Sequence, residues 1–162
     1  MDATTFLQVD HDALKTALRA LTDASADSAS RRMAFRTLRD GLEMHERIEE
    51  DVFYPAVMKV RSHGAREAVR SALEDHHVVD GLIVELDQRD VEDPQFSARA
   101  ALLRTALERH IAAEEEGMFA EARIHLTDER LERLGRRMEA LQGVLRFRGL
   151  TASVSQPSTS GG

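Results

Sequence analysis

Four histidines each occupy a core-facing position within a stretch of helical periodicity. Residues three and four apart lie on one face of an α-helix, and along these faces a histidine stands where a leucine would be expected. A buried polar group without a partner costs roughly 2–7 kcal/mol, so such side chains must be paired or ligated. The four are His11, His45, His76 and His110. Four polar side chains converging from four helices are satisfied most simply by sharing metal.

Two of these histidines are followed one helical turn later by an acid. Glu49 follows His45, and Glu114 follows His110, so each pair shares a helix face. An imidazole can supply a terminal ligand, whereas a carboxylate can bridge two ions through its two oxygens. Two bridging glutamates and four terminal histidines describe a dinuclear site, with positions left for oxygen, peroxide or water. A single His-x-x-x-Glu is weak evidence, but two copies with two further core histidines form a strong pattern.

Composition indicates one all-α domain. The chain has 162 residues, of which 42% are hydrophobic, and this is enough for a single core. Aromatic residues make up 4% and proline occurs three times, so packing rests on aliphatic side chains and helix propensity is high.

Charge and cysteine content exclude several functions. The formal net charge of −7 argues against a nucleic-acid partner, which requires a clustered basic face. No apolar run is long enough to span a membrane and no signal peptide is evident, so we expect a cytoplasmic protein without a membrane partner. With zero cysteines, any metal must be held by imidazole and carboxylate, which suits Fe, Mn or Zn.

The hydrophobic pattern predicts an up-down-up-down four-helix bundle over residues 1–125. The repeat of a lone histidine and a His-acid pair indicates an internal two-fold pseudo-repeat. A fifth helix is expected over 127–148, with Thr127 as its N-cap, and a disordered tail over 149–162. The first helix is expected to be capped by Thr4 or Thr5. The bundle helices are expected at about 4–21, 30–60, 65–87 and 95–122.

Several side chains leave alternatives open. Periodicity favours His76 over His77 as the core-facing residue, with His77 as the fallback. Asp80 lies one turn beyond His76 and is either an additional ligand or a solvent-facing acid. Tyr54 points away from His45 on an ideal helix, which favours a rim position with its hydroxyl in water. Pro55 disturbs that geometry, and a local widening of the helix would turn the phenol inward as an additional metal ligand.

Two further acids, Glu50 and Glu115, turn away from the predicted core faces. Each directly follows an acid of a His-x-x-x-Glu pair. We expect them to act from outside the ligand set or to lie on the surface.

These motifs together resemble hemerythrin-like (HHE, cation-binding) domains of the bacterial, actinobacterial type. The resemblance covers about residues 7–122. The motifs that carry it are His11-Asp12-x-Leu14, His45-x-x-x-Glu49-Glu50-x-x-Phe53-Tyr54-Pro55, Glu74-Asp75-His76 and His110-x-x-x-Glu114-Glu115-x-x-Met118-Phe119. It implies two iron ions, bridged by oxide or hydroxide and held by His11, His45, Glu49, His76, His110 and Glu114.

The chain departs from the oxygen carriers of this family. They hold a second histidine on the third helix, where Ala72 and Asp80 flank His76 here, and a His-x-x-x-x-Asp motif where Glu114 stands here at shorter spacing. The resemblance therefore implies redox turnover, with catalase-like decomposition of hydrogen peroxide or reaction with dioxygen. The alternative is a module that binds or senses oxygen, nitric oxide or iron without turnover.

A ferritin-like oxidase fits less well, because Glu74-x-x-His77 has no second copy. Zinc would also accept the ligand set. We expect the protein to act on small molecules as a monomer.

Overall fold

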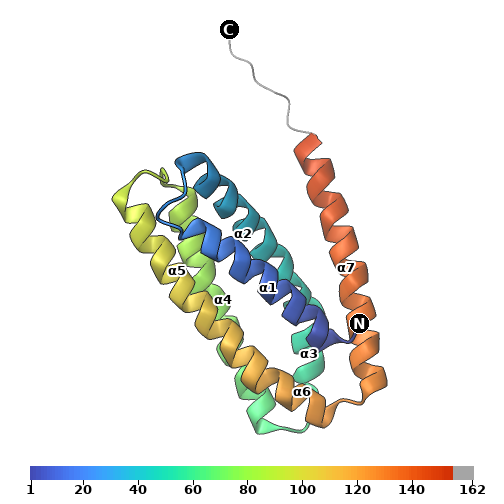
Figure 1. Cartoon of the computed structure of the whole chain (residues 1–162). Coiled ribbons are helices and arrows are strands. Elements are labelled where there is room, and N and C mark those ends of the chain that lie inside the picture. The colour runs from blue at the N-terminus through green and yellow to red at the C-terminus, as the bar shows by residue number, and fades with distance from the viewer. Residues whose placement is uncertain (155–162) are drawn as a thin grey trace.

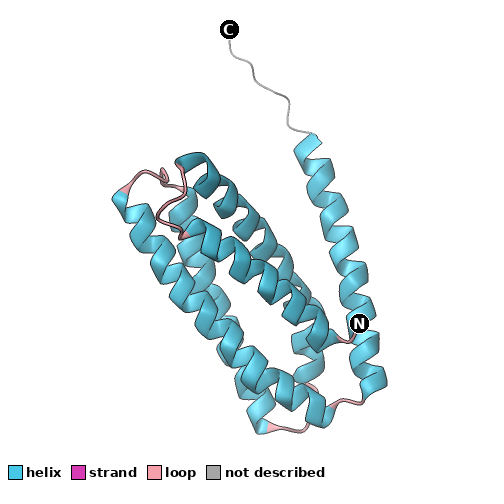
Figure 2. Cartoon of the chain, viewed as in Figure 1, coloured by secondary structure: helices cyan, strands magenta, loops and turns pink. Residues whose placement is uncertain are grey.

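The computed structural model describes residues 1–154, with side chains placed to residue 149, and these residues form helices joined by short connections (Figures 1 and 2). The bundle consists of α1 (Ala3–Leu21), α2 (Ser28–Ile48), α4 (His63–Asp87) and α5 (Pro94–Ala113). Two of these helices continue through a π-helical turn into a short α-helix. They are extended by η1 (Glu49–Phe53) with α3 (Tyr54–Val57) and by η2 (Glu114–Met118) with α6 (Phe119–His125). The predicted all-α bundle is confirmed.

Short polar side chains begin the helices. Asp27, Ser62 and Asp93 each accept a hydrogen bond from a backbone N–H of the first turn of α2, α4 and α5. The cap of α1 is Asp2, which accepts from the N–H groups of Thr4 and Thr5. The prediction of a threonine cap was wrong by two or three residues, because an acid that precedes the two threonines accepts hydrogen bonds from both of their N–H groups.

The last helix, α7 (Asp128–Val154), packs against α1, α2 and η1 and runs beside the bundle in Figure 1. Thr127 Oγ1 accepts from the backbone N–H of Arg130 at 3.4 Å, in the expected capping position. The helix extends to Val154, so residues 149–154 are helical where a disordered tail was predicted. The remainder of that predicted tail, 155–162, lies outside the described residues. Within residues 1–154, no helix is both long and apolar enough to cross a membrane.

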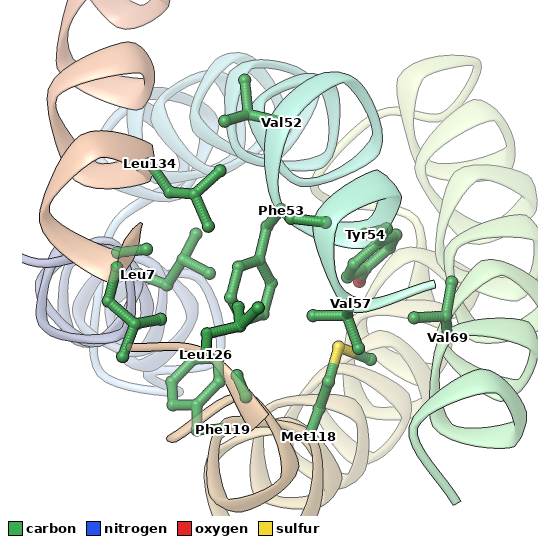
Figure 3. Packing of buried hydrophobic residues seen from close by; sticks show 14 of the residues in the cluster. Leu7, Val52, Phe53, Tyr54, Val57, Val69, Met118, Phe119, Leu126 and Leu134 are labelled. Carbon is green, nitrogen blue, oxygen red and sulfur yellow. The ribbon is translucent and has the colours of Figure 1, made fainter. Parts of the chain in front are cut away.

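The buried core is divided into two apolar clusters by a polar layer. One cluster packs Phe53, Phe119 and Leu7 with residues of α7 such as Leu134 (Figure 3). The other fills the opposite end of the bundle with leucines of all four helices and Phe96. On each bundle helix the core-facing histidine lies between residues of the two clusters, so the histidines form a layer at one height.

Candidate metal centre

All six predicted ligands are brought into this layer and are almost fully buried. Glu49 and His11 are 0% exposed, and none of the six exceeds 3%. The other four are His45, His76, His110 and Glu114. Burial of this many polar groups without partners would be strongly unfavourable.

The first group of ligand atoms joins α1, α2 and the two π-helical turns. His11 Nε2 lies 3.3 Å from Glu114 Oε2, and His45 Nε2 lies 3.3 Å from Glu49 Oε1. One ligand atom from each of these four residues lies within 4.8 Å of the others. Four nitrogen and oxygen donors at this separation can enclose one metal ion.

The second group shares Glu49 with the first. Glu49 Oε2 lies 3.2 Å from His76 Nε2, and donor atoms of Glu49, His76 and His110 lie within 4.8 Å of one another. The two oxygens of Glu49 therefore face different groups, Oε1 toward His45 and Oε2 toward His76. This is the arrangement expected of a bridging carboxylate.

Tyr54 is buried beside the second group, so the favoured rim position was wrong. It is 2% exposed, and its phenol oxygen lies 2.6 Å from Glu114 Oε1, 2.9 Å from Glu49 Oε2 and 3.2 Å from His76 Nε2. The inward rotation comes from η1, where the N–H of Tyr54 bonds to the carbonyl of Glu49 five residues earlier.

A second π-helical turn, η2, begins at the matching acid, Glu114. The N–H of Phe119 bonds to the carbonyl of Glu114, as Tyr54 does to Glu49. The sequence prediction expected a continuous helix here. The residue that matches Pro55 is Ala120, so a π-helical turn of this kind forms without a proline after it. The internal repeat therefore includes both π-helical turns. The residue after the turn is Tyr54, a phenol, in one half and Phe119, a phenyl group, in the other.

Two outer carboxylates hold the lone histidines from the neighbouring half of the bundle. Glu115 Oε1 lies 2.9 Å from His11 Nδ1, and Glu50 Oε1 lies 2.9 Å from His76 Nδ1. Each carboxylate accepts from the ring nitrogen that faces away from the ligand groups, which directs Nε2 toward the centre. Glu50 and Glu115, expected outside the ligand set, thus orient two of its members.

Asp10 and Asp75 are carboxylates that the sequence prediction missed. Asp10 Oδ2 lies 3.7 Å from His45 Nδ1, and Asp75 Oδ2 lies 3.9 Å from His110 Nδ1. Each precedes a core histidine in the sequence but faces the histidine of the adjacent helix. The repeated Asp-His dipeptide at 10–11 and 75–76 was the available signal.

The electrostatics of the centre are unfavourable for the side chains alone. Burial would raise the pKa of Glu49, yet the neighbouring His45 lowers it well below its ordinary value. Burial and the Glu49 carboxylate together raise the pKa of Glu114 to about 7. Burial also lowers the pKa of His110 to about 4, against the attraction of Glu49. Two adjacent buried carboxylates resist simultaneous ionisation, and a bound cation removes that conflict.

The other titratable candidates lie outside the ligand groups. His77 and Asp80 are exposed, so the structure does not bring these proposed additional ligands to the centre. Asp80 lines a surface cavity of about 490 Å³ together with Glu46 and Glu50. Glu46 is 9% exposed, and burial raises its pKa to about 8.

The site and the fold define a helical-bundle protein with a His/Glu centre that can bind metal. The profile of the Hemerythrin HHE cation binding domain matches residues 2–122, and the chain belongs to this family. An uncharacterized protein of Mycobacterium tuberculosis, Rv2633c, is 33% identical over 141 residues, which cover 86% of this chain and 84% of the relative.

The uncharacterized protein Mb2666c of Mycobacterium bovis matches with the same identity and coverage. A crystal structure of a Hemerythrin HHE cation binding domain-containing protein from Mycobacterium kansasii, an Rv2633c homolog, superposes with a TM-score of 0.83. It is 27% identical, and the match covers 96% of this chain and 94% of that chain.

Proposed function

We propose that the chain holds two iron ions in the buried centre and decomposes hydrogen peroxide. The observation that carries this proposal is a set of buried atoms without hydrogen-bond partners that face one another: His11 Nε2, His45 Nε2, His110 Nε2, Glu49 Oε1 and Glu114 Oε2. Buried lone pairs without partners are costly at the centre of a core, and two bound metal ions would satisfy all of them.

The donor set suits this assignment. Imidazole and carboxylate donors fit iron as well as manganese or zinc, and the match to a cation-binding family supports a bound metal. His11, His45 and Glu114 would hold one ion, His76 and His110 the other, and Glu49 would bridge them. Tyr54 would add a phenolate to the second ion, since its oxygen lies 3.2 Å from His76 Nε2.

Iron supplies the electron transfer that converts two peroxide molecules into two waters and dioxygen. The residues of the chain orient the ligands, hold protons and exclude bulk water. Glu50 and Glu115 fix the two lone histidines. In the metal-free side chains the Tyr54 hydroxyl donates its proton to Glu114 Oε1 at 2.6 Å, and this proton would be released when the phenolate binds metal. Because every proposed protein ligand is buried, the centre suits only small molecules such as peroxide or dioxygen.

The test is peroxide-dependent oxygen release by the iron-loaded protein, with iron content measured on the same sample. We expect two irons per chain and release above that of free iron. His76→Ala should lose iron and activity, whereas His77→Ala, the exposed neighbour, should retain both. Full activity in His76→Ala would contradict the site. A stable dioxygen adduct with no oxygen release would replace turnover by reversible binding.

A further inference from the structure

A second hollow lies between α7 and the segment that carries part of the candidate metal centre. Its volume is about 220 Å³. The wall opposite α7 is formed by Val52 of η1 and by Pro55 and Ala56 of α3, and Leu134 of α7 contributes from the other side. Val52 and Leu134 are visible at this junction in Figure 3. The hollow is on the outer side of the segment, whereas Glu49 and Tyr54 of the same segment face the centre.

Four cationic side chains line this hollow. Arg130, Arg133 and Arg137 follow the spacing of one helical face of α7, and Lys59 approaches from the end of α3. The only carboxylate among the described lining residues is Asp51, so the formal charge is four minus one, or +3. Asp51 is also paired with Arg47 at 2.6 Å, which leaves the cations less compensated still.

These cations are unpaired in a chain that has an excess of acids. The sequence has 29 acidic residues against 22 Lys and Arg. Other arginines of the described surface do pair along their own helix, as Arg104 does with Glu108 and Arg136 with Glu132. None of the four lining cations forms a salt bridge within 4.0 Å to any described residue. Hydrogen bonds, first of all from the Thr127 side chain, lower the pKa of exposed Glu129, and the charge of Arg133 adds to this effect.

We propose that this hollow binds a small organic phosphate. Arginine forks match phosphate oxygens with two parallel N–H bonds, and three arginines with one lysine balance a ligand of two or more negative charges. The floor formed by Val52, Pro55 and Leu134 is apolar, so it accommodates an apolar group next to the anion. The small volume excludes a large ligand. The site is independent of the metal centre, since none of its lining residues is a proposed metal ligand.

The experiment titrates the full chain, with its metal, with phenyl phosphate at low ionic strength by calorimetry. This probe combines a phosphate dianion with a ring and is compared with inorganic phosphate and with phenol. We expect saturable binding of phenyl phosphate, weaker binding of inorganic phosphate, none of phenol, and affinity that falls with added salt. Arg133→Gln with Arg137→Gln should weaken binding at least about tenfold.

The matched control is Arg136→Gln, which removes the same charge from the same helix but lies outside the hollow and is paired with Glu132. The affinity of Arg136→Gln for phenyl phosphate should stay within about twofold of the wild-type value. Lys59→Gln tests the opposite wall independently and should also weaken binding. An equal loss in Arg136→Gln, or no saturable binding of either phosphate, would overturn the proposal. Vesicles with phosphatidic acid distinguish the two possible sources of the phosphate group. If the vesicles compete with phenyl phosphate for the hollow, the ligand is a lipid headgroup, and if they do not, it is a free anion.

Discussion

The phenol oxygen of Tyr54 lies 2.6 Å from Oε1 of Glu114, so a hydrogen bond joins the two π-helical segments of the bundle. The position equivalent to Tyr54 in the other half is Phe119, which stacks on His11 with ring centroids 5.8 Å apart. Tyr54 stacks on His76 at 5.6 Å, with the rings inclined by 30° instead of 3°. At this position the two halves of the centre differ by one hydroxyl, and we expect the two metal positions to be chemically distinct.

Replacement of Tyr54 by Phe tests this asymmetry. Tyr54 is the single tyrosine of the chain, so any phenolate-to-iron absorption band must come from it. The Phe variant should lose that visible band while retaining iron. In the metal-free protein, the buried oxygen of Glu114 loses its partner, which costs about 1–3 kcal/mol of unfolding free energy. A spectrum identical to that of the wild type would show that the phenol does not bind metal.

The outer carboxylates should control metal affinity without being ligands. Glu50→Ala and Glu115→Ala each remove the partner of a histidine Nδ1, so the ring loses both its orientation and part of its basicity. We expect a loss of about 10–100-fold in metal affinity, measured by competition with a chelator. Glu116→Ala is the matched control, because this adjacent acid is exposed and should leave the affinity unchanged. Equal affinity in all three variants would contradict the role of the outer carboxylates.

The buried His/Glu cluster was predictable because polar residues on an apolar helical face are rare and costly. His11 and Glu49 follow directly from their positions between aliphatic residues, and periodicity alone separates buried His76 from exposed His77. Tyr54 was not predictable from an ideal helix, since the π-helical turn that rotates it inward changes the register by a fraction of a turn.

Relationships between helices were the other part that sequence reasoning missed. The contact of Asp10 with His45 depends on the rotation of α1 against α2, which no periodicity within one helix determines. The same holds for the hollow lined by Lys59 and Arg133, because it requires the packing of α7 against η1. Local spacing predicts which face of a helix is buried, but not which residue of a neighbouring helix it meets.

The N-cap of α1 should make stability dependent on pH in the acid range. Hydrogen bonds from Thr4 and Thr5 outweigh partial burial and lower the pKa of Asp2 from 3.8 to about 2. A lowered carboxylate pKa contributes stability above pH 3.8, and this contribution is lost as the pH falls toward 2. Asp2→Ala should cost about 1 kcal/mol at neutral pH.

Asp2→Asn separates the cap from its charge. Asn caps a helix about as well as Asp, so this variant should lose little stability at neutral pH but should lack the acid dependence. Water reaches the Asp2 carboxylate, so the charge contributes little. The free energy of unfolding of the wild type, relative to that of Asp2→Asn, should change by roughly 1 kcal/mol or less over the acid pH range. Urea unfolding from pH 2 to pH 5 measures it, and parallel curves for wild type and Asp2→Asn would contradict the assignment.

Two of the three glycines of α7, Gly135 and Gly143, should respond oppositely to alanine, because Gly135 faces the bundle and Gly143 does not. A Cβ added at Gly135 would lie 2.1 Å from the backbone oxygen of Met1, which cannot be moved without displacing the start of α1. Gly135→Ala should therefore destabilise the protein by about 1–3 kcal/mol. At Gly143 nothing lies within 4 Å of an added Cβ, so alanine should stabilise the helix by roughly 0.5–1 kcal/mol through its higher helix propensity. Denaturant midpoints of the two variants measure the difference. A neutral Gly135→Ala would mean that the N-terminus does not pack on α7, because the backbone contact alone predicts the loss.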